Sequence, residues 1–151
     1  MTIDISFYHL QRQTLSHVLP KLLEKALGAW LKTIIRAGDH EQLQHIDEEL
    51  WRFTPDSFLP HGHAKTPYPE RQQIYITTTD ENPNNATLLM ITGGGEAVNN
   101  FGDFTRCFDI FDGNSPDMVA AARARWSTYK NAGHKLTYWQ QNERGGWDKK
   151  G

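Results

Sequence analysis

The sequence predicts a single α/β domain with a central, mostly parallel sheet flanked by helices. Its 151 residues are 38% hydrophobic, which suits one compact domain with its own core. Strand-like and helix-like patterns alternate over residues 1–51, and a crossover helix is how parallel strands are joined. The spaced glycines that bind dinucleotides after a first strand are absent. The expected architecture is therefore Rossmann-like, without a nucleotide-binding fingerprint.

The first half of the chain contains two strand–helix pairs. Apolar and polar residues alternate over 3–7, which is typical of a short strand. Apolar residues then recur at helical spacing over 16–27, and Gly28 is a suitable end for that helix. A strand over 32–37 and a helix over 39–50 follow, the second helix beginning with a capping pair.

The second half adds four strands and one helix. The strands are expected over residues 74–76, 88–91, 106–111 and 136–139. The helix has Ser115 as its N-cap, Pro116 at its first position and Gly133 just after its end. These three signals make it the best-defined element of the sequence.

The domain is expected to span residues 1–139 as one unit. Residues 52–72 contain four prolines and are expected to be irregular surface chain. Residues 140–151 form a polar C-terminal tail with the composition of a flexible segment, and the sequence leaves its order open.

Composition and charge argue against several classes of protein. A formal net charge of −2 is a poor electrostatic footprint for direct binding of nucleic acid. The single cysteine, Cys107, excludes an intrachain disulfide and a cysteine-rich zinc site. The first residues lack a signal peptide, and no stretch has the apolar length of a transmembrane helix. We therefore expect a cytoplasmic protein.

The sequence contains no recognisable catalytic set. The glycines at 93–95 lack the lysine and hydroxyl of a phosphate loop, and Glu96 would repel phosphate. Cys107 lies in the middle of an expected strand, where a buried and unreactive thiol is usual. No Gly-x-Ser-x-Gly elbow is present. These observations favour a binding protein over an enzyme, with no catalytic residue and no cofactor.

The histidines do not make a convincing metal site. His61 and His63 lie in the proline-rich segment without an evident third ligand, whereas catalytic zinc usually has three. His40 and His45 are five residues apart, which is off the spacing of one helix face. Surface histidines are the expectation, and no metal is expected.

The last helix carries the most suggestive surface. Arg123, Trp126, Ser127 and Lys130 lie at helical spacing and share one face. Two cations beside an aromatic ring suit a short peptide that offers a carboxylate and an apolar side chain. An ordinary amphipathic helix with solvated cations is the alternative, and periodicity alone favours it.

A second aromatic group follows the second helix. Trp51, Phe53, Phe58 and Leu59 lie where the chain becomes irregular. They form either a small hydrophobic cluster that holds the loop or a docking patch for a partner, because large apolar residues are costly when left in water. The pattern does not separate these two interpretations.

Seven blocks together resemble the chi subunit of bacterial DNA polymerase III holoenzyme. They are residues 7–10 (FYHL), 50–51 (LW), 56–61 (DSFLPH), 109–112 (DIFD), 122–130 (ARARWSTYK), 132–133 (AG) and 138–139 (YW). They span most of the chain in the expected order, and the ordered set is what makes the resemblance specific.

The resemblance implies a non-catalytic replication adaptor. Such proteins link the clamp-loader assembly to single-stranded DNA-binding protein by binding its acidic C-terminal tail, which ends in a phenylalanine carboxylate. Arg123 matches the tail-binding arginine and Trp126 a tail-binding aromatic residue. Ser127 stands where the best-studied members of the family carry lysine, a charge that Lys130 can supply one turn along. We expect Phe111 to wall the pocket with Trp126.

The resemblance also assigns a role to the second aromatic group. Trp51 and Phe58 match positions that dock the psi subunit or a competing helicase. Partners are thus expected to be proteins, with DNA contacted only indirectly and no membrane. Two other readings stay open: a small nucleotide- or metal-dependent α/β enzyme, and direct binding of single-stranded DNA through exposed tryptophans, against which the net charge argues.

Overall fold

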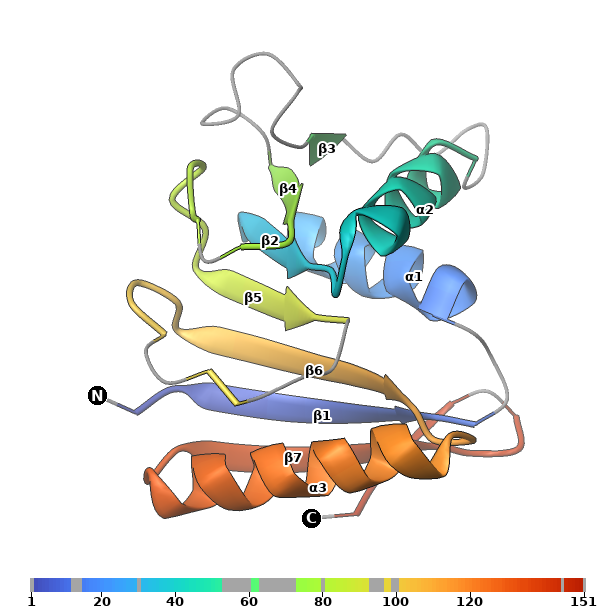
Figure 1. Ribbon diagram of the computed structural model, residues 1–151, viewed down its shortest axis with the longest axis vertical. Coiled ribbons are helices and arrows are strands. Elements are labelled where there is room, and N and C mark those ends of the chain that lie inside the picture. The colour runs from blue at the N-terminus through green and yellow to red at the C-terminus, as the bar shows by residue number, and fades with distance from the viewer. Residues whose placement is uncertain are drawn as a thin grey trace.

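The computed structural model has one α/β domain with a single sheet (Figure 1). It describes residues 2–11, 15–29, 31–52, 61–62, 73–79, 81–92, 97–98, 101–144 and 146–150. The elements in chain order are β1 (Asp4–Leu10), α1 (Leu15–Gly28), β2 (Thr33–Arg36), α2 (His40–Arg52), β3 (His61–Gly62), β4 (Ile74–Thr77), β5 (Leu88–Ile91), β6 (Arg106–Asp112), α3 (Pro116–Asn131), β7 (Lys135–Gln141) and β8 (Trp147–Lys149). The predicted fold class is confirmed.

The sheet has the strand order β3-β4-β2-β5-β6-β1-β7-β8. All neighbouring strands are parallel except β7 and β8, which are antiparallel. The chain passes from β1 through α1 to β2 in one direction, and from β6 through α3 across β1 to β7 in the other. Because crossovers of one hand that run in opposite directions place their helices on opposite faces, α1 and α3 cover different sides of the sheet.

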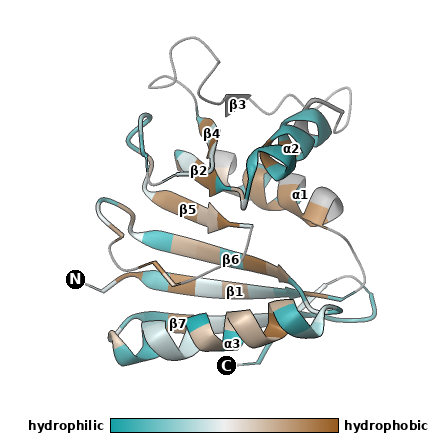
Figure 2. Ribbon diagram, in the orientation of Figure 1, coloured by the Kyte–Doolittle hydropathy of each residue, from teal (hydrophilic) through white to brown (hydrophobic). Residues whose placement is uncertain are grey.

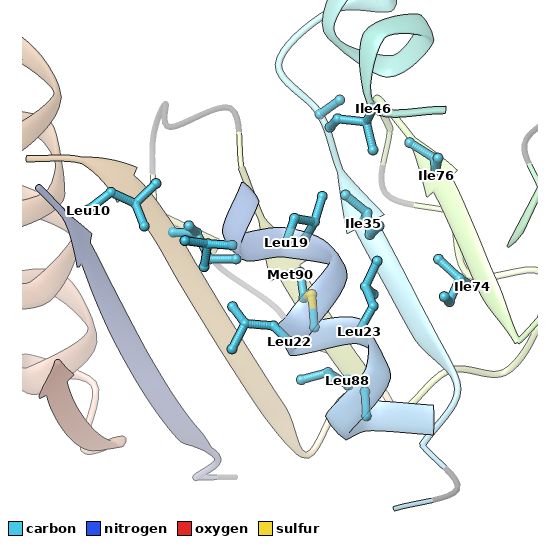
Figure 3. Packing of buried hydrophobic residues seen from close by; sticks show 14 residues of the cluster. Leu10, Leu19, Leu22, Leu23, Ile35, Ile46, Ile74, Ile76, Leu88 and Met90 are labelled. Atoms are coloured by element: carbon cyan, nitrogen blue, oxygen red, sulfur yellow. The ribbon is translucent and has the colours of Figure 1, made fainter. Parts of the chain in front are cut away.

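Two buried clusters fill the two faces. On β1, Phe7 points to the α3 side and Tyr8 to the α1 side, as the alternation of a strand requires. The α1-side cluster consists of Leu10, Val18, Leu19, Leu22, Leu23, Ala26, Ile35, Ala37, Ile46, Ile74, Ile76, Leu88, Met90 and Ile110 (Figure 3). The α3-side cluster consists of Ile3, Ile5, Phe7, Ile34, Tyr75, Ala86, Leu89, Ile91, Phe101, Phe104, Cys107, Phe111, Ala122 and Tyr129.

Hydropathy follows these layers. Figure 2 shows hydrophobic central strands and a largely hydrophilic α2, which packs on the sheet through Ile46 and turns its charged residues outward. Within the described part of the chain, no helix combines the length and apolarity needed to cross a membrane.

Two short strands were not expected from the sequence. Residues 61–62, placed in irregular chain, pair with β4 as β3. The strand expected over 136–139 continues to Gln141, and β8 then pairs with it inside the expected tail. Trp147 anchors β8 to the sheet. The centroid of its ring lies 5.1 Å from that of Tyr8, and the ring packs against the α1-side cluster. The polar residues around this one tryptophan hide the strand from pattern analysis.

Replacing Trp147 by alanine should destabilise the domain measurably. The ring is half-buried, so we expect the free energy of unfolding to fall by about 1–3 kcal/mol, less than for a fully buried tryptophan. Urea denaturation measures this change. Arg144→Ala, in the exposed turn before β8, is the matched control and should leave stability unchanged. Equal stability of the Trp147→Ala and wild-type proteins would show that β8 does not hold the sheet edge.

Candidate functional site

Helix α3 begins and ends as its sequence predicts. The Ser115 hydroxyl accepts a hydrogen bond from the Met118 backbone N–H at 3.4 Å, and Pro116 occupies the first turn. Gly133 follows the helix with φ of +88°, a left-handed conformation that glycine adopts without strain. These ends fix which residues of α3 face the sheet.

A buried ion pair joins α3 to the sheet. Arg125 donates from Nε to Asp109 Oδ2 at 2.6 Å and from Nη2 to Oδ1 at 2.9 Å, and each side chain is only 1% exposed. Burial raises the pKa of Asp109, and the hydrogen bonds and charge of Arg125 oppose that rise. The bidentate geometry allows one orientation of the guanidinium, so it fixes the rotation of α3 against β6.

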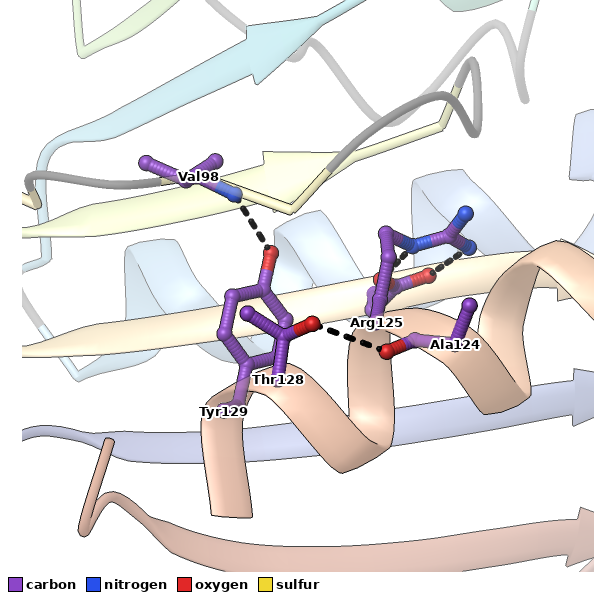
Figure 4. A network of polar contacts seen from close by, with 6 residues as sticks. Val98, Ala124, Arg125, Thr128 and Tyr129 are labelled. Carbon is purple, nitrogen blue, oxygen red and sulfur yellow. Dashed lines mark hydrogen bonds and ion pairs between the residues drawn. The ribbon is translucent and has the colours of Figure 1, made fainter. Parts of the chain in front are cut away.

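Tyr129 provides a second polar anchor one turn later. Its hydroxyl accepts a hydrogen bond from the Val98 backbone N–H at 3.0 Å, so the loop before β6 is tied to α3 (Figure 4). Burial raises the pKa of Tyr129 well above its usual value, so its hydroxyl is neutral at physiological pH.

The inward residues determine what α3 presents to solvent. With Ala122, Arg125 and Tyr129 buried, the helical repeat leaves Arg123, Ser127 and Lys130 exposed and Trp126 half-buried. The two exposed cations lie seven residues apart, or roughly 10 Å along the helix axis. The structure therefore brings together the four residues of α3 that the sequence selected.

Aromatic side chains support Trp126 from the sheet. Its ring lies edge-on to Tyr138 at 5.7 Å and to Phe7 at 5.3 Å between centroids. Phe111 is 2% exposed and packs behind this layer, 6.2 Å from Tyr138. Phe111 thus lies beneath this surface, because its strand directs it into the α3-side cluster. It is too buried to form a wall of the pocket with Trp126, a role that the sequence had led us to expect.

His9 and Tyr138 complete the surface and were missed by sequence reasoning. His9 Nδ1 and the Tyr138 hydroxyl are hydrogen-bonded at 2.5 Å, although the residues are 129 positions apart. The His9 ring also lies against Gly113, where an added Cβ would come within 1.9 Å of His9 Cδ2. Only glycine fits there, which explains the close turn after β6.

Arg123 contributes to the electrostatics of this surface, after burial. Burial lowers the pKa of His9, the positive charge of Arg123 lowers it further, and the Asp112 carboxylate opposes both. Burial raises the pKa of Tyr138, and Arg123 works against that rise. The positive charge of Arg123 is thus felt at both rings, and helical spacing of three residues makes Arg123 a neighbour of the half-buried Trp126 on α3. This arrangement can bind a carboxylate and an apolar side chain together.

Several other residues predicted from the sequence lie wholly or partly outside the described part of the structure. Trp51 lies in the last turn of α2, but its side chain is not among the described parts. Phe58, His63 and residues 93–95 lie outside the described residues. His45 lies on α2 with Nε2 4.0 Å from Glu49 Oε1. Among the described residues, no three histidine, cysteine or carboxylate side chains gather as a metal site. The buried Cys107 is confirmed, and burial raises the pKa of its thiol well above the usual value.

Comparisons with known proteins agree on one family. The family model "DNA polymerase III chi subunit, HolC" matches residues 1–137. "Probable DNA polymerase III subunit chi" of Rickettsia prowazekii (strain Madrid E) is 35% identical over 88 residues, which cover 58% of this chain and about half, 53%, of that relative. "DNA polymerase III subunit chi" of Pseudomonas aeruginosa is 26% identical over 116 residues, 77% of this chain and 79% of that relative.

Removing one partner of the buried ion pair should be far more damaging than removing both. Arg125→Leu leaves Asp109 as an uncompensated buried charge, so we expect the free energy of unfolding to fall by about 3–5 kcal/mol. The double variant with Asp109→Leu should recover most of that loss, because no buried charge remains. Urea denaturation of both proteins, with Lys130→Ala as the exposed control, measures the difference. If the Arg125→Leu protein were as stable as the wild type, the buried ion pair would not be holding α3 against the sheet.

Proposed function

The chain belongs to the DNA polymerase III chi subunit family, and from this premise we propose that it is a non-catalytic adaptor of the replisome. It links the clamp-loader assembly to single-stranded DNA-binding protein in the cytoplasm. It does so by binding the acidic C-terminal tail of that protein on the outer face of α3. This role needs a docking surface and no reacting group.

The observation that carries the proposal is the exposed Arg123 beside the half-buried Trp126. Arg123 binds the terminal carboxylate, and the indole of Trp126 takes the phenyl ring next to it. Tyr138 and His9 form the sheet side of the pocket, the part that the sequence assigned to Phe111. Lys130 attracts the acidic residues of the tail from a distance, while Ser127 adds no charge.

The second docking surface stays a prediction. Trp51 and Phe58 would dock a psi subunit or a helicase at the end of α2. Residues 40–52 carry four carboxylates and one arginine, so a partner on this side would need a basic or apolar contact surface. Helix α2 contacts β4 near one edge of the sheet, whereas α3 contacts β6 and β7, so partners on the two helices would bind apart from each other.

One observation favours the alternative of a small α/β enzyme. A cavity of about 320 Å³ opens at the carboxyl ends of β1 and β6, where the strand order reverses and related folds bind ligands. Asp112 on its rim would repel phosphate, which argues against a nucleotide there. Under our proposal, ATP, NAD and divalent metals leave the melting temperature unchanged; a rise on adding any one would support the enzyme.

Arg123→Ala should weaken binding of the tail strongly. In the complex the Arg123 guanidinium and the terminal carboxylate form a desolvated charge pair. Losing such a pair typically costs about 2–5 kcal/mol of binding free energy, so we expect an affinity at least about 30-fold lower. Fluorescence anisotropy of a labelled acidic peptide ending in phenylalanine measures it. Lys130→Ala should have a smaller effect that disappears at high salt. Arg144→Ala is the control cation. Unchanged affinity in the Arg123→Ala protein would remove α3 as the site.

Tail binding should also strengthen as the pH falls from about 8 to about 6. In the free protein the pKa of His9 lies below its usual value, because of burial and Arg123. A bound carboxylate favours imidazolium and raises that pKa, so the complex takes up protons. The same anisotropy assay across pH measures the slope. His9→Gln should flatten it, and a wild-type affinity that falls on acidification would contradict the site.

A further inference from the structure

The face of the sheet opposite α3 carries a second group of aromatic side chains. Strand alternation directs Phe108 of β6, Tyr8 of β1 and Trp139 of β7 to the α1 side, and Trp147 of β8 lies against Tyr8. Tyr8 packs edge-on to Phe108 at 5.2 Å. We call these four residues the aromatic platform. Helix α1 packs over β6, and no described helix covers β7 or β8 on this side.

The platform opens into a cavity of about 230 Å³. All four aromatic residues line it, together with the end of α1. Trp139 is half-buried and belongs to neither buried cluster, so its ring is not committed to the core. Burial raises the pKa of Tyr8 to about 12, which keeps its hydroxyl neutral. The cavity therefore offers ring surface and a neutral hydroxyl, with no negative charge from Tyr8.

Cations border the platform. Lys25 and Arg106 line the cavity itself. The register places Lys135 on the same face as Arg106, with Asp4 on the strand between them, and sets Lys149 opposite Trp139. Arg106 and Lys135 thus flank Asp4 at one end of these strands, and Lys149 lies four residues further along, in the row of Tyr8 and Trp139.

The net charge of −2 does not describe this face. Helix α2 alone contributes four carboxylates against one arginine, and it packs at the other end of the sheet against β4. Much of the negative charge therefore lies away from the platform, so the overall net charge does not set the charge of this face.

We propose that the aromatic platform binds single-stranded nucleic acid without sequence preference. Bases stack on Trp139 and Trp147, and Arg106, Lys135 and Lys149 contact the phosphates. Stacking on aromatic rings in a positively charged groove is how proteins hold single strands regardless of sequence. Four strands span roughly 15 Å, and RNA-binding sheets of that width stack two or three bases on their aromatic residues.

The proposal goes beyond tail binding and uses the opposite side of the sheet. When α3 holds the tail of single-stranded DNA-binding protein, the aromatic platform stays free to contact the DNA that this partner covers. The high local concentration created by tethering would make even weak binding effective.

The test is fluorescence anisotropy of a labelled oligothymidine of about twelve nucleotides, without any other protein, at low salt. We expect the wild type to bind in a salt-dependent manner and Trp139→Ala to bind about tenfold more weakly or worse. Lys135→Glu, at an exposed position that should not disturb folding, should weaken binding and reduce its salt dependence. Arg123→Ala, on the other face, should bind DNA as the wild type does.

Three results would overturn the proposal. The first is that the folded wild type does not bind the oligothymidine at low salt. The second is that the wild-type and Lys135→Glu proteins bind it equally well. A third is loss of oligonucleotide binding in the Arg123→Ala protein, which would place the DNA on α3. Because the assay contains no tail, failure here leaves the adaptor role intact, whereas the peptide titration of Arg123→Ala tests that role separately.

Discussion

The buried pair of Asp109 and Arg125 is the constraint on which the α3 surface depends. Two hydrogen bonds at 2.6 and 2.9 Å hold the helix in one rotation, and at 1% exposure neither charge can be solvated if the helix turns. Rotation by one residue would carry Arg123 or Trp126 away from Tyr138 and His9. The ion pair therefore positions residues of the α3 surface that it does not itself contact.

Strand alternation divides the sheet between two surfaces. On β1, Phe7 and His9 support the α3 side, while Tyr8 contributes to the aromatic platform. On β7, Tyr138 and Trp139 divide in the same way. A protein of this size can thus present two chemically distinct faces without a second domain, one built around a guanidinium and one around edge-on aromatic rings and lysines.

The sequence predicted the elements well because their local signals agree. Alternation, helical spacing and caps placed every major helix and strand within a few residues, and Ser115, Pro116 and Gly133 behave as their residue types predict. The parallel sheet followed from the alternating order of elements. The exceptions, β3 and β8, are two and three residues long and depend on pairing with distant strands, which local pattern does not contain.

The candidate site was predictable only on one element. Arg123, Trp126, Ser127 and Lys130 share a helix face that spacing reveals. His9 and Tyr138 meet across 129 residues, and only the strand order brings them together. Arg125 looks like another surface cation two positions from Arg123, and its burial could not be foreseen because its partner lies on β6.

The most direct test of the account is nitrogen-15 nuclear magnetic resonance of the five tryptophan indoles during titration with the acidic tail peptide. Each indole reports on its own surface. We expect the Trp126 signal to shift in proportion to occupancy while those of Trp139 and Trp147 stay in place. Shifts confined to Trp139 and Trp147, or to Trp51, with Trp126 unmoved at saturation, would contradict it.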